Sequence, residues 1–292
     1  MTGCSSGIGR VAARLLMERG YRVIGGVCEQ GSPKGVEERP LELGDLESVR
    51  EFAVGLREVQ MDALLLNAGV QGYDLLARTK QGFERTFGVN HLGHYLLVRL
   101  LLPQVADGGA VVFTTSATHD PAEKIGVPTP RHARAEWLAY PERDPEVDRG
   151  SMKAGLRAYT ASKLCNVMTA RRLAKEPDVM ARGLRVHAFD PGLVAETGLV
   201  RTGPFVLRRV IWPMLSVMRP MLRGSNGVAE VGRALADLGD GAVRVGDEVY
   251  CSLRRGRVVG MAPSVMAQDD AACEQLWRES AVIARLEPDM AQ

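Results

Sequence analysis

A tyrosine and a lysine four residues apart are the pair in this 292-residue sequence best suited to acid–base chemistry. Tyr159 and Lys163 lie in a stretch with helical spacing, residues 154–174, so both side chains would share one helix face. A nearby ammonium favours the phenolate and is expected to lower the pKa of the tyrosine. Tyr159 could then give or take a proton at a carbonyl or hydroxyl oxygen. The alternative is a surface pair, since this spacing often arises by chance.

Two further polar residues could complete such a site. Ser116 follows the apolar run Ala110–Thr114 and could position or polarise a substrate oxygen, or it could simply cap the next turn. Asn90 lies within a long helical stretch, residues 82–102. Asparagine is locally unfavourable there, which indicates a kink or a bound water, although a polar residue facing solvent is the alternative.

Glycines at the start of the chain could hold an anion. Gly3, Gly7 and Gly9 open a stretch with a helical apolar face. Without Cβ atoms the backbone can approach a pyrophosphate, which would face the helix N-terminus. The spacing is GxxxGxG rather than GxGxxG, and an ordinary strand–helix turn is the alternative.

Other turns extend this candidate dinucleotide site. Asn67-Ala68-Gly69 follows a buried-type run, and Asp45-Leu46 could place a carboxylate near an adenine, unless Asp45 is a helix N-cap. No Asp stands at Cys28, where the second strand ends, so NADP is favoured, with NAD as the alternative. Arg10 or Lys34 would have to meet the 2′-phosphate, and Lys163 could bind the nicotinamide ribose.

Strand-like and helix-like stretches alternate along the whole chain, which predicts an α/β fold with a doubly wound, Rossmann-like parallel sheet in a single domain, residues 1–292. No strand precedes the first glycine turn, so we expect that the first strand is missing and that the natural chain starts upstream. Residues 121–148 form an irregular excursion that is expected to be functional. The predicted strands are 23–27, 63–66, 110–114, 185–189 and, as the last, 249–253; the last predicted helix is 270–286.

Composition excludes several other classes of protein. The formal charge is +2 without a basic run, so no nucleic-acid partner is indicated. No signal peptide or apolar run of membrane-spanning length is present, and the five scattered cysteines favour reduced thiols in the cytoplasm. The five histidines form no metal-binding motif, so they are interpreted as structural and no metal is expected.

Taken together, these segments resemble the short-chain dehydrogenase/reductase family. The matching segments, in chain order, are Thr2–Gly9 (TGCSSGIG), Asn67–Gly69 (NAG), Val89-Asn90, Ser116, Tyr159–Lys163 (YTASK) and Asp190–Gly192 (DPG). The resemblance implies a catalytic tetrad of Asn90, Ser116, Tyr159 and Lys163, with Asn90 holding a proton-relay water. The cofactor-binding residues that it implies, with those inferred above, are Gly3, Ser5, Ser6, Gly7, Ile8, Gly9, Cys28, Asp45, Leu46, Asn67, Ala68, Gly69, Tyr159, Lys163, Pro191 and Gly192.

Finer features are similar to the retinol-dehydrogenase-like and protochlorophyllide-reductase-like members. They include VNHLGHYLLVRLLLP, the long gap between Ser116 and Tyr159, and SKLCN, whose Cys165 matches the reductases or is a small buried hydrophobe. The leading hypothesis is an NADP-dependent carbonyl reductase or alcohol dehydrogenase for a lipophilic small molecule. A C=C reductase and a non-catalytic dinucleotide sensor are the alternatives.

Two further expectations concern partners. The segment 203–224 could form an apolar lid over the substrate, although ordinary helix packing would give the same pattern. Its apolar residues are Val206, Val210, Leu215, Met218 and Met221. The family resemblance also implies a homo-oligomer built through the helices that carry Asn90 and Tyr159.

Overall fold

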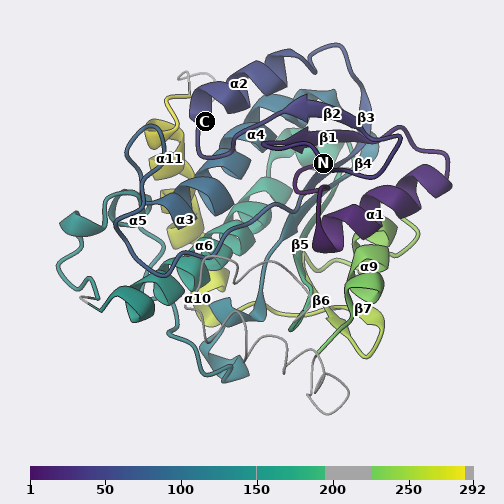
Figure 1. Ribbon diagram of the computed structural model, residues 1–292. Coiled ribbons are helices and arrows are strands. Elements are labelled where there is room, and N and C mark those ends of the chain that lie inside the picture. Colours follow the sequence, from purple (N-terminus) through teal and green to yellow (C-terminus); the bar gives the residue numbers. More distant parts are fainter. Residues whose placement is uncertain (149, 195–224, 287–292) are drawn as a thin grey trace.

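A parallel sheet with helices on both faces forms the centre of the computed structural model, which describes residues 1–148, 150–194 and 225–286 (Figure 1). Strands β3 to β6 run parallel in sequence order, and β7 pairs antiparallel with β6. This confirms the predicted Rossmann-like α/β fold, but β7 corrects the expectation that residues 249–253 form the last strand. The strands are β1 (Ile24–Val27), β2 (Glu37–Pro40), β3 (Met61–Leu66), β4 (Val105–Thr114), β5 (Arg185–Asp190), β6 (Tyr250–Arg254) and β7 (Arg257–Gly260).

Two apolar cores lie on the two faces of the sheet, as the alternation along β4 requires. Ala110 and Val112 pack in the core under α1 (Gly7–Glu18) and α9 (Val228–Asp240). Val111 and Phe113 belong to the core on the other face. That face is covered by α2 (Leu46–Val54), α4 (Gly93–Leu101), α6 (Ser151–Ala174) and α11 (Asp270–Ile283), and the shorter helices are α3 (Arg85–Phe87), α5 (Ala135–Ala139), α7 (Pro177–Ala181) and α10 (Val265–Gln268).

The first two residues join β1 to β3. Met1 donates its amino group to the Ile24 carbonyl and accepts from the Gly26 N–H, and the Thr2 N–H donates to the Leu65 carbonyl. Beyond them, a cavity of about 190 Å³ separates the ends of the two strands. Sheet pairing between β1 and β3 therefore passes through two residues, and the expected upstream start stays a prediction.

Helices α4 and α6 are enclosed by their own chain. Every residue from 159 to 170 of α6 and from 93 to 98 of α4 is buried. Helix α11 packs on α6, and its Trp277 carbonyl accepts a hydrogen bond from Tyr95 of α4 (2.8 Å). Neither helix keeps an open face over these turns, so the expected family interface through them is covered by this chain.

The excursion 121–148 packs against the same side. Its helix α5 contacts α11, and the Pro128 carbonyl accepts from Thr160 of α6 (2.8 Å). The expected lid, residues 203–224, lies outside the described residues. In the described parts of the chain, no helix combines the length and apolar character needed to cross a bilayer.

Trp277 is the largest fully buried side chain that fixes α11 on α4 and α6. We expect Trp277→Ala to lower the free energy of unfolding by about 3–5 kcal/mol, because it leaves a large cavity. Urea unfolding would measure this loss. The matched control is Val282→Ala on the same helix, where the side chain is 77% exposed and a change within about 0.5 kcal/mol is expected. Equal effects of the two substitutions would contradict the role given to α11.

Candidate active site

A cavity of about 680 Å³ opens at the carboxyl ends of the parallel strands. It extends from the glycine loop to the middle of α6, so it brings together most of the predicted site. The predicted residues that line it are Gly3, Ser5, Ser6, Gly7, Ile8, Cys28, Asn67, Ala68, Gly69, Ser116, Tyr159, Lys163, Pro191 and Gly192. Gly9, Asp45, Leu46 and Asn90 are not in its wall.

The glycine loop has the geometry of a phosphate cradle. Gly3 and Gly7 have positive φ angles (69° and 51°), and a Cβ on Gly9 would lie 2.1 Å from the Gly3 carbonyl oxygen. Helix α1 starts at Gly7, in the cavity wall. Its N-cap Ser6 makes no side-chain capping bond, so the cap supplies no side-chain acceptor for the first N–H groups of the helix. This loop fits the pyrophosphate of a dinucleotide.

A buried network attaches this loop to the neighbouring turn. The Thr2 hydroxyl oxygen accepts from the N–H groups of Asn67 and Ala68 (both 3.0 Å) and lies 3.0 Å from His94 Nε2. His94 Nδ1 lies 3.0 Å from the Asn90 carbonyl oxygen, which can only accept, so Nδ1 carries the proton. Burial lowers the pKa of His94 to about 4, which keeps it neutral and supports its structural interpretation.

The adenine end of the cavity differs from the sequence-based expectation. Asp45 is the N-cap of α2, accepts from the Glu47 N–H and pairs with Lys80 (2.6 Å), while Leu46 is buried. The N-cap alternative therefore holds, because the helix starts directly after Asp45. Glu42 and Leu43 line the cavity instead. Both residues come shortly after the short strand β2, and that position could have identified them. The polar sequence of β2 makes the strand itself hard to recognise.

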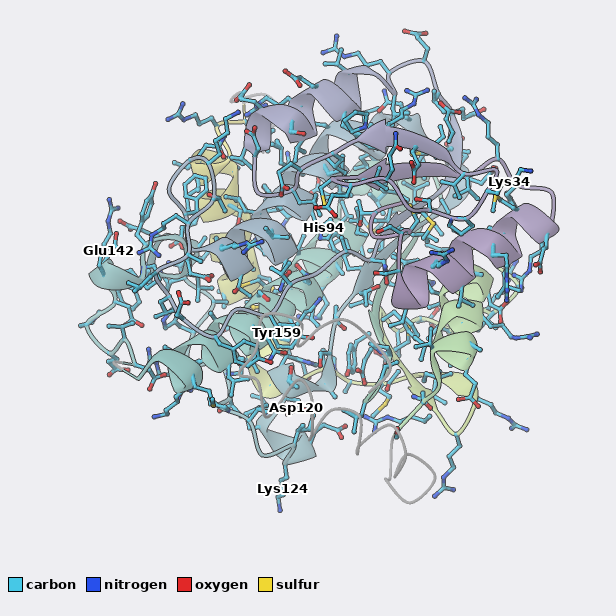
Figure 2. All side chains as sticks on the ribbon, in the orientation of Figure 1. Lys34, His94, Asp120, Lys124, Glu142 and Tyr159 are labelled. Carbon is cyan, nitrogen blue, oxygen red and sulfur yellow. The ribbon has the colours of Figure 1, made fainter. Side chains whose placement is uncertain are left out.

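Two basic residues were candidates for a 2′-phosphate contact. Arg10 donates to the carbonyls of Ser5 (3.4 Å) and Gly31 (3.2 Å), so its guanidinium lies beside the loop that follows β1. Lys34 is exposed and lies beyond α1 in the view of Figure 2, away from Tyr159. Cys28 and Glu29 line the same end of the cavity. Arg10 is thus the candidate that the geometry holds close to the cavity.

Tyr159 and Ser116 meet at the other end of the cavity. Tyr159 lies near the middle of the molecule, between His94 and Asp120 in the view of Figure 2. Burial raises the pKa of its phenol, while a hydrogen bond with the Ser116 side chain opposes that rise. The expectation that Lys163 lowers this pKa is wrong, because desolvation dominates. The phenol is therefore protonated at neutral pH.

The Ser116 turn is held by residues that the motif analysis did not assign a role. Asp190 Oδ1 accepts from the N–H groups of Ala117 and Gly192 (both 3.0 Å), and Oδ2 accepts from Ser252 (2.7 Å). His119 Nδ1 lies 2.8 Å from the Ser116 carbonyl oxygen. Ser116 also accepts from the Thr118 N–H, so it caps the following turn as well as facing Tyr159.

Lys163 is buried beneath the cavity. Its Nζ donates to the Thr114 carbonyl (2.9 Å) and lies 5.7 Å from the centre of the Tyr159 ring. Burial lowers the pKa of the Lys163 ammonium to about 8. The ammonium is therefore held at the cavity wall, where a ribose hydroxyl could accept from it.

Asn90 lies in a π-helical turn, residues Gly88–Leu92, so the helix is locally irregular here, and the solvent-facing alternative is wrong because Asn90 is buried. Its side chain pairs with both the N–H and the carbonyl of Val70 (2.7 and 2.8 Å) and donates to Ser162 (3.0 Å). The backbone carbonyl of Asn90 accepts hydrogen bonds from the side chains of Asn166 and His94. Asn90 thus anchors the segment after Gly69 to α6, and the relay water stays a prediction.

Cys165 is fully buried and outside the cavity wall, as the small-hydrophobe interpretation predicts. Burial raises the pKa of its thiol. No group of three or more His, Cys, Asp or Glu side chains among the described residues is placed to hold a metal ion.

Comparison with known proteins gives consistent relatives. The family model for short chain dehydrogenases matches residues 1–124. Human retinol dehydrogenase 12 is 31% identical, over 96% of this chain and 84% of that protein. Protochlorophyllide reductase A from Oryza sativa subsp. japonica is 29% identical, over 82% of this chain and 67% of that protein. The crystal structure of an uncharacterised Mycobacterium paratuberculosis protein is similar, with a TM-score of 0.70, 29% identity and coverage of 98% and 92%.

The buried ammonium of Lys163 should cost stability. Its pKa falls from 10.5 to about 8, so between these pH values the unfolded chain binds a proton that the folded chain does not, and stability rises with pH through that window. Below pH 8 this pKa shift corresponds to a loss of about 3 kcal/mol in the free energy of unfolding. We expect Lys163→Met to raise the free energy of unfolding at pH 7 by about 1–3 kcal/mol, with the gain shrinking towards pH 10.

Urea unfolding at pH 7 and pH 10, without dinucleotide, would measure this gain, with exposed Lys34→Met as the matched control. A Lys163→Met variant less stable than the wild type at pH 7 would show that the ammonium stabilises the fold.

Proposed function

Because this chain belongs to the short-chain dehydrogenase/reductase family, in the branch of the retinol dehydrogenases and protochlorophyllide reductases, we propose that it transfers a hydride between NADP(H) and a lipophilic carbonyl compound or alcohol. The observation that carries the proposal is one cavity that runs from the glycine loop to Tyr159, Ser116 and Lys163. A cofactor seated on the loop would lie in the same space as the acid–base group.

The residues of the chain have separate tasks in this reaction. When bound, the nicotinamide supplies or accepts the hydride. The Tyr159 hydroxyl, protonated at neutral pH because burial raises its pKa, is in the form that donates a proton to a carbonyl oxygen. Ser116, which is hydrogen-bonded to Tyr159, would bind the same carbonyl oxygen. Lys163 would hold the ribose of the cofactor. Reduction of a carbonyl uses the protonated phenol, and oxidation of an alcohol would use the ionised one.

The lipophilic substrate is supported by the wall around Tyr159. Val127 of the excursion and Met152 and Leu156 of α6 line the cavity there, together with Val194. A carbonyl compound with an apolar body would bury it against these side chains. The C=C alternative has less support, since Cys165, one of the features that suggested it, is buried in the core.

The location that we propose is cytoplasmic. All five cysteines are free in the structure, and four of them are buried. Unpaired thiols are typical of a reducing compartment.

Tyr159→Phe tests the reaction itself. Removal of the phenolic hydroxyl should lower kcat for ketone reduction at least 100-fold, because it removes the proposed proton donor. NADPH consumption with aryl alkyl ketones would measure it. NADPH affinity should stay within about threefold, since the ring remains; a variant that retains most of its turnover would favour the non-catalytic sensor.

Arg10→Ala tests the cofactor preference. Loss of a charge-assisted contact to a 2′-phosphate should weaken NADPH binding about 10- to 100-fold and leave NADH binding nearly unchanged. Fluorescence titration of both dinucleotides would measure the two affinities. A larger effect of Lys34→Ala would assign the contact to Lys34, and tighter binding of NADH by the wild type would overturn the preference for NADP.

A further inference from the structure

A second phenol shares the substrate end of the cavity with Tyr159. Tyr73 lines the cavity together with Gln71, Met152 and Leu156. It is close enough to Tyr159 that a charge on Tyr73 would raise the pKa of the Tyr159 phenol. None of the family motifs includes Tyr73, and the acid–base chemistry of Tyr159 does not need it.

The backbone that carries Tyr73 is fixed from two sides. The Asn90 side chain binds both polar groups of Val70, three residues earlier. Gly155 of α6 lies directly against the segment: a Cβ there would come within 2.6 Å of the Gly72 carbonyl oxygen and of Tyr73 Cα. Gly155 is one helical turn before Tyr159, so this close approach sets the two tyrosines on neighbouring positions of the wall.

The Tyr73 hydroxyl is prepared as a hydrogen-bond donor. Gln71 Nε2 donates to the Tyr73 oxygen (2.9 Å), and within residues 1–148, 150–194 and 225–286 this is the hydrogen bond that the hydroxyl makes. The amide uses the oxygen as an acceptor, which leaves the phenolic proton for a partner in the cavity. Burial raises the pKa of Tyr73, so the phenol stays protonated at neutral pH.

The surroundings of this donor define what it can bind. Met152 and Leu156 give this part of the cavity an apolar wall. A substrate bound against it would also meet the oriented hydroxyl of Tyr73. An acceptor oxygen on the substrate would satisfy that hydroxyl, whereas a purely hydrocarbon group would leave it without a partner once water is displaced.

We propose that Tyr73, oriented by Gln71, forms a second substrate subsite that binds an acceptor oxygen separate from the reacting carbonyl. This inference rests on the proposed carbonyl reduction and narrows its substrate class. The preferred substrates are lipophilic ketones or aldehydes that carry a further ether, carbonyl or hydroxyl oxygen a few bonds from the reacting carbon.

The test compares matched substrates with a matched variant. The substrates are phenyl ketones with a methoxy oxygen one, two or three carbons from the carbonyl, each paired with the alkyl phenyl ketone that has CH₂ in place of that oxygen. For at least one pair, Tyr73→Phe should lower kcat/KM for the methoxy ketone about 5- to 10-fold and leave the alkyl ketone within about twofold. Tyr140→Phe, outside the cavity wall, is the control and should change neither.

The outcomes separate the two proposals. Equal effects of Tyr73→Phe on both members of every pair would overturn the subsite while ketone reduction stands. If the wild type reduces no ketone, the same pairs are compared by calorimetric binding in the presence of NADP⁺. A preference for the methoxy ketone that Tyr73→Phe removes would then support the subsite without the reaction, and its absence in the wild type would overturn it.

Discussion

The hydrogen bond from the Lys163 ammonium to the Thr114 carbonyl joins the centre of α6 to the end of β4. Tyr159 lies one turn before Lys163, and Ser116 lies two residues after Thr114, so this bond sets the phenol and the serine hydroxyl at the same end of the cavity. Burying an ammonium is unfavourable, and the hydrogen bond to the Thr114 carbonyl offsets part of that cost. The arrangement is one in which stability is given up for a preorganised site.

A second, neutral network supports the first. Thr2, the turn at Asn67, His94 and Asn90 are linked by hydrogen bonds that attach the glycine loop to α4. Asn90 then carries the connection to Val70 and to Ser162 of α6. The glycine loop and helix α6 are therefore linked by one continuous polar network.

The sequence was informative where chemistry depends on short spacing and weak where it depends on register or burial. The shared face of Tyr159 and Lys163 followed from helical spacing. The choice between Asp45 and Glu42 depended on where a short polar strand ends, which no apolar pattern marks. The pKa of Tyr159 was misjudged because a neighbouring charge is visible in a sequence and desolvation is not. Tyr73 was missed because its position is set by contact with Gly155, a residue distant along the chain.

The cover that α11 forms over α6 has a consequence for biosynthesis. The outer face of residues 159–170 is covered only when residues 270–283 are in place, because Trp277 and its neighbours pack against it. A nascent chain that ends after β5 would still expose this outer face of α6 to water. This face of α6 is therefore covered only after α11 has been synthesised, and earlier intermediates would present an apolar surface for chaperones to bind.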